Sequence, residues 1–319
     1  MAASIDPALF HPDAISDETA ANNAKVAAEM AAAPPLHELV PQAVRQARID
    51  GKGPQGPLVF DPDAVNRTIP GPDGEIPIRI FQPPSEPTGV YLYIHGGGWV
   101  LGAFNQEDAL LAKAARRAGC VVVSVDYRLA PEDPYPAGPD DCEAAALWLT
   151  QHAQSEFGSD RLVIGGGSAG GHLAALTLLR MRDRHSFTGF RGANLMYGAF
   201  DLSETPSQSQ APQHYVIPLP AMRWFYDHYV PTQDRRDPDV SPTYAPLHDM
   251  PPALFSVGTL DPLLDDSLFM HARWLAAGNQ ADLAIYPGGL HGFNGTPGLK
   301  IGGDANRRVD AYLAAALAD

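Results

Sequence analysis

A serine lies at the centre of the segment Gly166-Gly167-Ser168-Ala169-Gly170, which has the pattern G-x-S-x-G. The segment follows an expected strand at 161–164 and precedes an expected helix at 172–184, the context of a tight strand-to-helix turn. Such a turn strains the serine backbone, and only glycine fits two positions before and after it. The hydroxyl group then lies at a helix N-terminus, whose amides favour developing negative charge. The pattern predicts that Ser168 is a nucleophile.

The same glycines also fit a dinucleotide-binding fingerprint, G-x-G-x-x-G, through Gly165, Gly167 and Gly170. That interpretation needs an acidic residue at the end of the next strand to bind a ribose. The region around Phe190 has no acid, and Asp201 comes too late. We therefore favour the nucleophilic serine.

A second glycine-rich segment, His95-Gly96-Gly97-Gly98-Trp99, follows the apolar run Val90–Ile94. Three glycines at the tip of a buried strand let backbone amides point together into a cleft. This is how an oxyanion hole is built, and the amide of the residue after the nucleophile, Ala169, completes it. His95 is expected to hold the loop through hydrogen bonds to the neighbouring backbone rather than to act as a base.

A serine hydroxyl is a weak nucleophile and needs a base, which in turn needs an acid that orients it. In strand-to-helix turns of this kind the chain order is serine, acid, histidine. His291 follows a late strand in a glycine-rich loop, whereas His271 is expected in the middle of a helix. Asp261 follows the strand at 253–257, and the two aspartates after it open the next helix as caps. Ser168, Asp261 and His291 therefore meet at the carboxyl edge of the expected sheet.

Short apolar strands alternate with helical segments along most of the chain. This alternation predicts an α/β fold with a mostly parallel sheet covered by helices. The expected strands are 76–81, 90–94, 121–125, 161–164, 193–197, 253–257 and 283–286, and the expected helices are 107–118, 140–157, 172–184, 265–277 and 304–317. A hairpin turn is expected at Gly71-Pro72-Asp73-Gly74.

Two regions interrupt this alternation. Residues 1–50 are rich in alanine and polar residues and contain several prolines, which predicts short helices without a core of their own. Residues 202–230 begin with a Ser-, Gln- and Pro-rich stretch and end in a short aromatic helix at 221–229, which indicates an insertion. We expect residues 51–319 to form one catalytic domain that contains this insertion.

Composition excludes several classes of protein. The chain has 319 residues and a formal net charge of −15, so phosphate backbones and anionic lipid surfaces are poor partners. Its two cysteines, Cys120 and Cys142, are expected to be buried free thiols, and the spacing of a zinc site is lacking. Neither a secretory signal in the first residues nor an apolar run of about 18 residues is found, so we expect a cytoplasmic protein without stable membrane association.

Taken in order, these motifs resemble the hormone-sensitive lipase-like branch of the α/β-hydrolases, the bacterial esterases with an H-G-G-G loop. The segment Asp126-Tyr127-Arg128-Leu129-Ala130-Pro131-Glu132 is similar to a D-Y-R-L-A-P-E motif of that family. Asp261-Pro262-Leu263 and His291-Gly292-Phe293 are similar to its acid and base loops. Arg128 and Glu132 are expected to form a structural network under the H-G-G-G loop.

The resemblance implies a catalytic triad of Ser168, Asp261 and His291 and an oxyanion hole made by the amides of Gly97, Gly98 and Ala169. It also implies a small helical cap built from residues 1–50 and 202–230. One departure is Gly167, where the family often has aspartate before the nucleophile. This departure affects local hydrogen bonding rather than the chemistry.

We therefore expect a serine carboxylesterase that hydrolyses short-chain esters of small molecules through an acyl-enzyme on Ser168, with no metal or organic cofactor. An amide, lactone or carbamate remains an alternative substrate, and a small-molecule receptor on the same fold is a further alternative. The sequence leaves a homodimer open. The candidate substrate-binding residues are aromatic or apolar side chains near the site: Trp99, Tyr197, Met222, Trp224 and Phe225.

Overall fold

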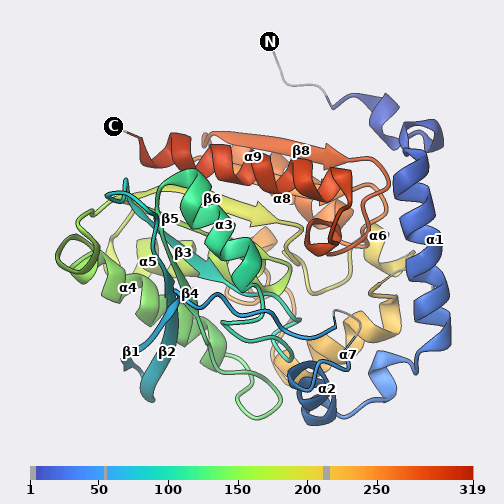
Figure 1. Ribbon diagram of the computed structural model, residues 1–319, viewed down its shortest axis with the longest axis horizontal. Helices are drawn as coiled ribbons and strands as arrows, with labels where there is room; N and C mark the ends of the chain where they lie inside the picture. The colour runs from blue at the N-terminus through green and yellow to red at the C-terminus, as the bar shows by residue number, and fades with distance from the viewer. Residues whose placement is uncertain (1–4, 54–55, 211–215, 319) are drawn as a thin grey trace.

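A central eight-stranded sheet has the strand order β1-β2-β4-β3-β5-β6-β7-β8 in the computed structural model, which describes residues 5–53, 56–210 and 216–318 (Figure 1). Strand β2 runs antiparallel to its neighbours β1 and β4, and all strands from β4 to β8 are parallel. β1 and β2 form the predicted hairpin, with Gly71 opposite Gly74. The prediction of a mostly parallel sheet flanked by helices is confirmed.

The strands are β1 (Val65–Gly71), β2 (Gly74–Phe81), β3 (Val90–Ile94), β4 (Val121–Val125), β5 (Leu162–Gly167), β6 (Phe190–Met196), β7 (Ala253–Gly258) and β8 (Ala281–Tyr286). The helices are α1 (Asp17–Ala32), α2 (Pro41–Ile49), α3 (Asp108–Ala118), α4 (Ala137–Phe157), α5 (Ala169–His185), α6 (Pro206–Ser209), α7 (Leu219–Tyr229), α8 (Leu264–Ala276) and α9 (Lys300–Leu317). Short 3-10 turns include Leu36–Glu38, between α1 and α2.

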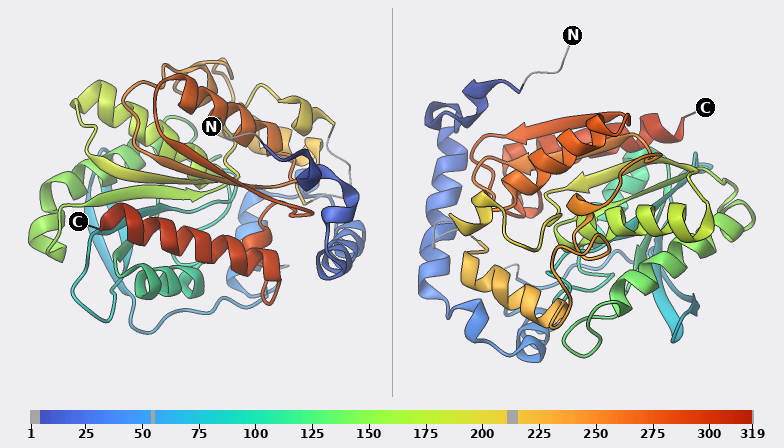
Figure 2. Two further views of the ribbon diagram at one scale, coloured as in Figure 1. Left: turned by 90° about the horizontal axis from the view of Figure 1, so that it is seen from above. Right: turned by 180° about the vertical axis from the view of Figure 1, so that it is seen from behind.

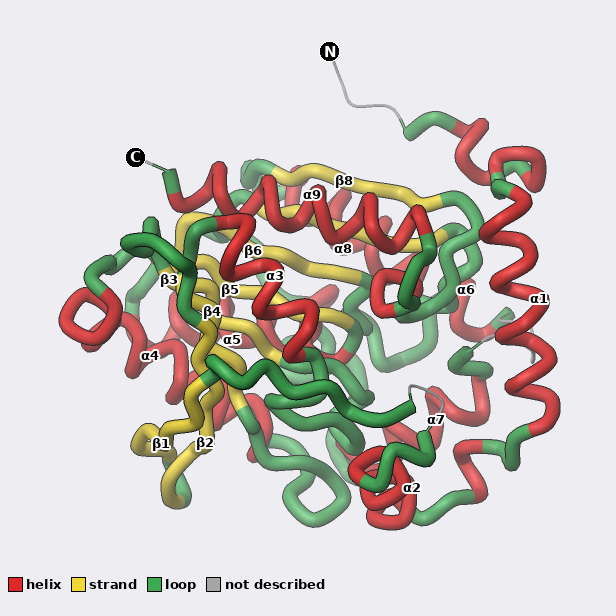
Figure 3. The backbone as a smooth tube through the Cα atoms, viewed as in Figure 1, coloured by secondary structure: helices red, strands yellow, loops and turns green. Residues whose placement is uncertain are grey.

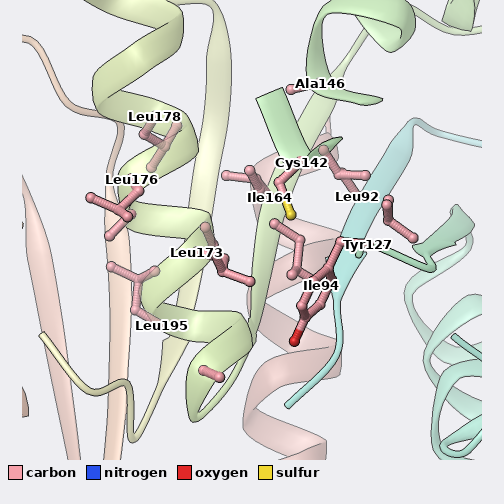
Figure 4. Packing of buried hydrophobic residues seen from close by; sticks show 14 of the residues in the cluster. Leu92, Ile94, Tyr127, Cys142, Ala146, Ile164, Leu173, Leu176, Leu178 and Leu195 are labelled. Carbon is pink, nitrogen blue, oxygen red and sulfur yellow. The ribbon is translucent and has the colours of Figure 1, made fainter. Parts of the chain in front are cut away.

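Helices cover both faces of the sheet, and the alternating side chains of β3 show why both faces are apolar. Leu92 and Ile94 point toward α4 and α5, where they belong to the same apolar cluster as Leu173 of α5 (Figure 4). Tyr91 and Tyr93 point to the opposite face, which α3 and α9 cover. Every residue of β3, β4 and β7 is buried, because these strands have helices on both sides. β1 at the edge of the sheet is mostly exposed.

The N-terminal helices do not join either of these layers. In Figures 1 and 2, α1 runs along the side of the molecule toward which the parallel strands point, and α2 lies there beside α7. The turn at Leu36–Glu38 packs against α7, and α1 contacts α9. Figure 3 shows that the loops following the parallel strands gather at this same side. Segments 5–50 and 216–230 therefore lie together over the carboxyl edge of the sheet, where ligand sites of open α/β sheets are found.

The observed elements differ from the predicted ones mainly at the glycine-rich turn. Strand β5 continues through three glycines to Gly167, and α5 begins at Ala169 instead of His172. Glycine is rare in strands because it has no side chain to pack, so the pattern alone ended the strand at Ile164. Here glycine is required because neighbouring chain approaches closely: a Cβ on Gly165 would lie 2.3 Å from the carbonyl oxygen of Asn194.

Two smaller predictions also concern the fold. Cys120 and Cys142 are buried free thiols, as predicted. Among the residues that the structure describes, no helix is both long enough and apolar enough to cross a membrane.

Candidate active site

Ser168 lies in the strained turn between β5 and α5 that its sequence context predicted. Its backbone has φ 58° and ψ −124°, a conformation that side-chain-bearing residues rarely adopt. A Cβ on Gly166 or Gly170 would lie 2.1 Å or 1.9 Å from the carbonyl oxygen of Ile94, so both positions must be glycine. The amide of Ser168 donates to the carbonyl oxygen of Met196 on the neighbouring strand. The turn is thus fixed by close packing on β3 and β6.

His291 and Asp261 lie beside this serine, in the loops after β8 and β7. The imidazole Nε2 of His291 is 2.8 Å from the Ser168 hydroxyl oxygen, and its Nδ1 is 3.1 and 3.0 Å from the two carboxylate oxygens of Asp261. The Asp261 side chain is fully buried and also accepts a hydrogen bond from the amide of Leu263. A proton on Nδ1 therefore faces the carboxylate, which leaves Nε2 free to accept the hydroxyl proton.

The loop after β3 lies against the serine turn. A Cβ on Gly96 would lie 2.9 Å from the carbonyl oxygen of Gly167 and 3.5 Å from Cβ of Ser168. Gly97 has φ 113° and Gly98 has φ 61°, values that glycine adopts without strain. The structure therefore brings the two glycine-rich segments of the sequence together.

His95 holds this loop as expected. Its Nδ1 donates to the carbonyl oxygen of Gly96 at 2.8 Å, and its ring stacks on Tyr127 with centroids 4.3 Å apart. Burial lowers the pKa of His95 to about 4, so the imidazole stays neutral. The Tyr127 hydroxyl donates to the backbone carbonyl of His95.

The five candidate substrate-binding residues occupy different places. Trp99 is buried, stacks on Tyr229 at 4.5 Å and donates its indole N–H to His172. Met222 is buried in the apolar core. These two side chains therefore pack inward.

The other three candidates lie against the loops after β3 and β8, either directly or through a neighbouring ring. The ring of Phe225 lies over Gly98, where an added Cβ would come within 2.2 Å of it, and Trp224 packs edge-on against Phe225. The buried ring of Tyr197 lies edge-on to His291 with centroids 4.9 Å apart, and its hydroxyl donates to Asn294. Phe225 thus contacts the loop after β3, and Tyr197 contacts the histidine loop.

Glu132 and Arg128 do not form one network, contrary to the expectation. Arg128 pairs with Asp141 and Asp73, whereas Glu132 pairs with Arg45 from helix α2. Hydrogen bonds from Arg45 lower the pKa of Glu132 to about 2. The sequence contains no local signal for Arg45, because its partner lies 87 residues away.

No group of three histidine, cysteine, aspartate or glutamate side chains suited to a metal ion occurs in the described part of the chain. The chemistry that the described residues can support is acyl transfer, because a serine hydroxyl, an imidazole and a buried carboxylate lie in hydrogen-bond contact. A parallel sheet with these groups in the loops after β5, β7 and β8 is the arrangement of an α/β hydrolase.

Comparison with known proteins gives the family. Residues 91–295 match a family described as having the alpha/beta hydrolase fold. The carboxylic ester hydrolase LipN of Mycobacterium tuberculosis is 35% identical over 241 residues, which are 72% of this chain and 64% of LipN, so the chain spans just under two thirds of that relative. An ethyl acetate hydrolase of Pseudomonas putida is 31% identical over 81% of this chain and 85% of its own.

Solved structures agree. A hyperthermophilic esterase from Pyrobaculum calidifontis superposes with a TM-score of 0.84 at 31% identity, covering 93% of this chain and 98% of its own. The chain belongs to the α/β-hydrolase family, in its hormone-sensitive lipase-like branch, and is a carboxylic ester hydrolase.

Proposed function

We propose that Ser168 is the nucleophile of this carboxylesterase, His291 its general base and Asp261 the acid that orients the base. One observation carries this proposal: His291 is within hydrogen-bond distance of Ser168 through Nε2 and of Asp261 through Nδ1. A base placed between a hydroxyl and a buried carboxylate is the geometry that activates a serine.

The reaction then proceeds in two halves. His291 takes the hydroxyl proton as Ser168 attacks the ester carbonyl, and the carbonyl oxygen becomes an oxyanion that accepts hydrogen bonds from the amides of Gly97, Gly98 and Ala169. The tetrahedral intermediate expels the alcohol, to which His291 gives the proton, and an acyl-enzyme remains on Ser168. Water, deprotonated by His291, then attacks the acyl-enzyme. The second tetrahedral intermediate breaks its bond to the Ser168 oxygen, His291 returns the proton to that oxygen, and the carboxylic acid is released.

A cap within residues 1–50 and 202–230, of which 1–4 and 211–215 lie outside the described residues, limits the size of the acyl group. The position of Phe225 over Gly98 supports this proposal, because it places an aromatic ring of the insertion against the proposed oxyanion hole. The contacts of the N-terminal segment support it too: Asn23 of α1 donates to the carbonyl oxygen of Gly288, three residues before the base, and the side chain of Ile15, just before α1, packs on the same glycine. A pocket closed from both sides has a finite depth.

Short-chain esters are therefore the proposed substrates. Each buried CH₂ group adds about 0.8 kcal/mol to binding until the pocket is full. Butyrate or hexanoate esters should match or exceed acetate, and activity should be weak beyond about ten carbons. A cytoplasmic location is part of the proposal, supported by the two buried free thiols.

The test is kcat/KM for p-nitrophenyl esters from acetate to palmitate, with matched anilides to separate ester from amide hydrolysis. The proposal expects a maximum at four to six carbons, an absolute dependence on Ser168 and much slower anilide cleavage. A maximum at palmitate would overturn the proposed cap, and anilides cleaved as fast as esters would overturn the substrate class.

A further inference from the structure

The loop after β3 has an unfavourable backbone conformation. Gly97, Gly98 and Trp99 follow one another with φ angles of 113°, 61° and 60°. Glycine adopts such angles freely, but Trp99 has a Cβ and is strained there. A conformation of this kind persists only where the surroundings hold it. The amides of Gly97 and Gly98 therefore depend for their direction on contacts from outside the loop.

Helix α2 supplies one of these contacts through a single side chain. The Nε of Arg45 donates to the carbonyl oxygen of Val100 at 2.7 Å, next to the strained Trp99. Its Nη2 donates to the carbonyl oxygen of Ala130 at 2.5 Å. The amide of Ala130 in turn donates to the carbonyl oxygen of Trp99. Arg45 thus holds the carbonyl group of Val100 directly. It holds the preceding carbonyl group, that of Trp99, through the backbone of Ala130.

The guanidinium group is itself held in one orientation. Nη1 and Nη2 of Arg45 donate to the two carboxylate oxygens of Glu132, both at 2.9 Å, and Gln42 donates to the same carboxylate at 2.6 Å. A planar guanidinium bound at two points by a carboxylate presents its Nε–H in a fixed direction. Lysine has no equivalent group, so only arginine makes this set of contacts.

From these contacts we infer that Arg45 is a positioning residue for the oxyanion hole, holding the loop so that the amides of Gly97 and Gly98 face the developing negative charge. The inference rests on the proposed function, since it assumes that these amides form the oxyanion hole. It gives helix α2 a role in the chemical step in addition to covering the pocket.

A merely structural Arg45 would dock α2 and nothing more. Its loss would then lower the melting temperature and leave the chemistry of the folded enzyme unchanged. A positioning Arg45 predicts a selective loss of transition-state stabilisation, because binding of the ground-state ester does not depend on the oxyanion amides.

The experiment compares the variants Arg45→Ala, Arg45→Lys and Glu132→Gln with Arg67→Ala. Arg67 is a matched control because it also forms a single ion pair with a distant residue, Glu156, but at the far edge of the sheet on β1. Each variant is assayed with p-nitrophenyl butyrate and with a trifluoromethyl ketone of the same acyl length, which forms an anionic adduct with the serine. Active-site titration corrects for folded enzyme, and melting temperatures are measured in parallel.

We expect Arg45→Ala to lower kcat about ten- to a hundredfold with less than a threefold change in KM, since removing one oxyanion donor outright costs about 10²- to 10³-fold. The Ki of the ketone should rise in proportion to the fall in kcat/KM. Arg45→Lys should restore the melting temperature more than the activity, Glu132→Gln should have a smaller effect, and Arg67→Ala should keep the wild-type kcat and Ki.

The inference is overturned if Arg45→Ala lowers the melting temperature but keeps kcat and Ki per active site. If Arg45→Ala does not fold, the Arg45→Lys variant provides the test. Wild-type kcat and Ki in Arg45→Lys would overturn the inference, because lysine lacks the several N–H donors of the guanidinium group. Failure of the proposed function looks different: the ketone would not inhibit the wild type, and the Ser168→Ala variant would remain active.

Discussion

The turn that carries Ser168 and the loop that follows β3 contact each other, but they are held in different ways. The turn is fixed by its neighbours in the sheet, because Gly166 and Gly170 pack directly on the carbonyl oxygen of Ile94. The loop after β3 is held by residues from distant parts of the chain. Arg45 reaches it from α2, the amide of Ala130 from the segment after β4, and Phe225 from α7.

The two segments should therefore respond differently to substitutions. A change in the turn acts on a rigid backbone and should affect folding or remove the chemistry altogether. A change around the loop acts on side chains that can shift, so it should lower the rate gradually and leave the fold intact.

Replacing the base should have the largest effect on the folded enzyme. His291→Ala is expected to lower kcat by about 10⁴-fold or more, because His291 is the proposed base and its Nε2 contacts the Ser168 hydroxyl. His271→Ala is the control, since this buried ring lies on α8 and packs on Phe255 of β7. Its kcat at 25 °C should stay within about threefold of the wild type. Loss of activity in the His271 variant alone would show that His271 is the base and that the assignment to His291 is wrong.

Adding one methyl group should affect stability in the turn and activity in the loop after β3. In Gly170→Ala the new Cβ meets the backbone of β3 at 1.9 Å, which cannot move, so we expect a loss of about 3 kcal/mol or more in the free energy of unfolding. In Gly98→Ala the new Cβ meets the side chain of Phe225 at 2.2 Å, which can shift, and alanine at φ 61° adds a backbone cost of about 1–2 kcal/mol, less than the loss expected for Gly170→Ala. This variant should fold, with kcat/KM reduced about ten- to a hundredfold. Urea unfolding and ester hydrolysis measure the two effects, and equal stability losses would refute the contrast.

Restoring the aspartate common in the family should have a moderate effect. A Cβ on Gly167 lies 3.1 Å from the ring of Tyr197 and 3.2 Å from its hydroxyl, so Gly167→Asp must displace the ring that lies against His291. We expect kcat to fall about three- to tenfold. A double-mutant cycle with Tyr197→Phe, which also removes the hydrogen bond to Asn294, measures the coupling. Full activity of Gly167→Asp would show that the Tyr197 ring has no part in holding His291.

Acid should lower the stability of the folded protein through two buried histidines, one in the loop after β3 and one that contacts it. Burial lowers the pKa of His172, which binds the Trp99 indole, to about 4, as it does for His95. Both rings are neutral in the folded state, whereas the unfolded chain binds protons below about pH 6.5. Their contribution to stability is therefore complete above pH 6.5 and is lost as the pH falls toward 4.

This pH effect is tested by melting temperatures of the wild type and His172→Asn between pH 8 and 4.5. The variant should be less stable at pH 8 but should lose less on acidification, because one titrating group is gone. Buried Asp266, whose pKa is raised to about 7 by burial, acts in the opposite direction in both proteins. An identical slope in the two proteins would mean that His172 does not titrate on unfolding.

The sequence was sufficient to predict the turn, because its determinants are local. The apolar run Val90–Ile94 marks a buried strand, and the spacing of glycines around Ser168 marks a tight turn. The positions of Asp261 and His291 followed from their place after late strands. These features depend on residues within a few positions of one another.

The sequence was not sufficient for the supports of the loop. The pairing of Arg45 with Glu132 joins segments 87 residues apart, and periodicity carries no information on such a contact. The partner of the Trp99 indole could not be predicted for a similar reason: its N–H donates to His172, which lies in helix α5, 73 residues along the chain. Polar partners of this kind are set by the tertiary fold.

The central claim is that Ser168 forms the acyl-enzyme. The most direct measurement is intact-mass analysis and peptide mapping after reaction with a p-nitrophenyl phosphonate ester, which phosphonylates an activated serine. We predict one adduct per chain, on the peptide that contains Ser168, with loss of esterase activity in proportion to labelling, and no adduct in Ser168→Ala. An adduct on another residue, or ester hydrolysis that persists in Ser168→Ala, would contradict the account.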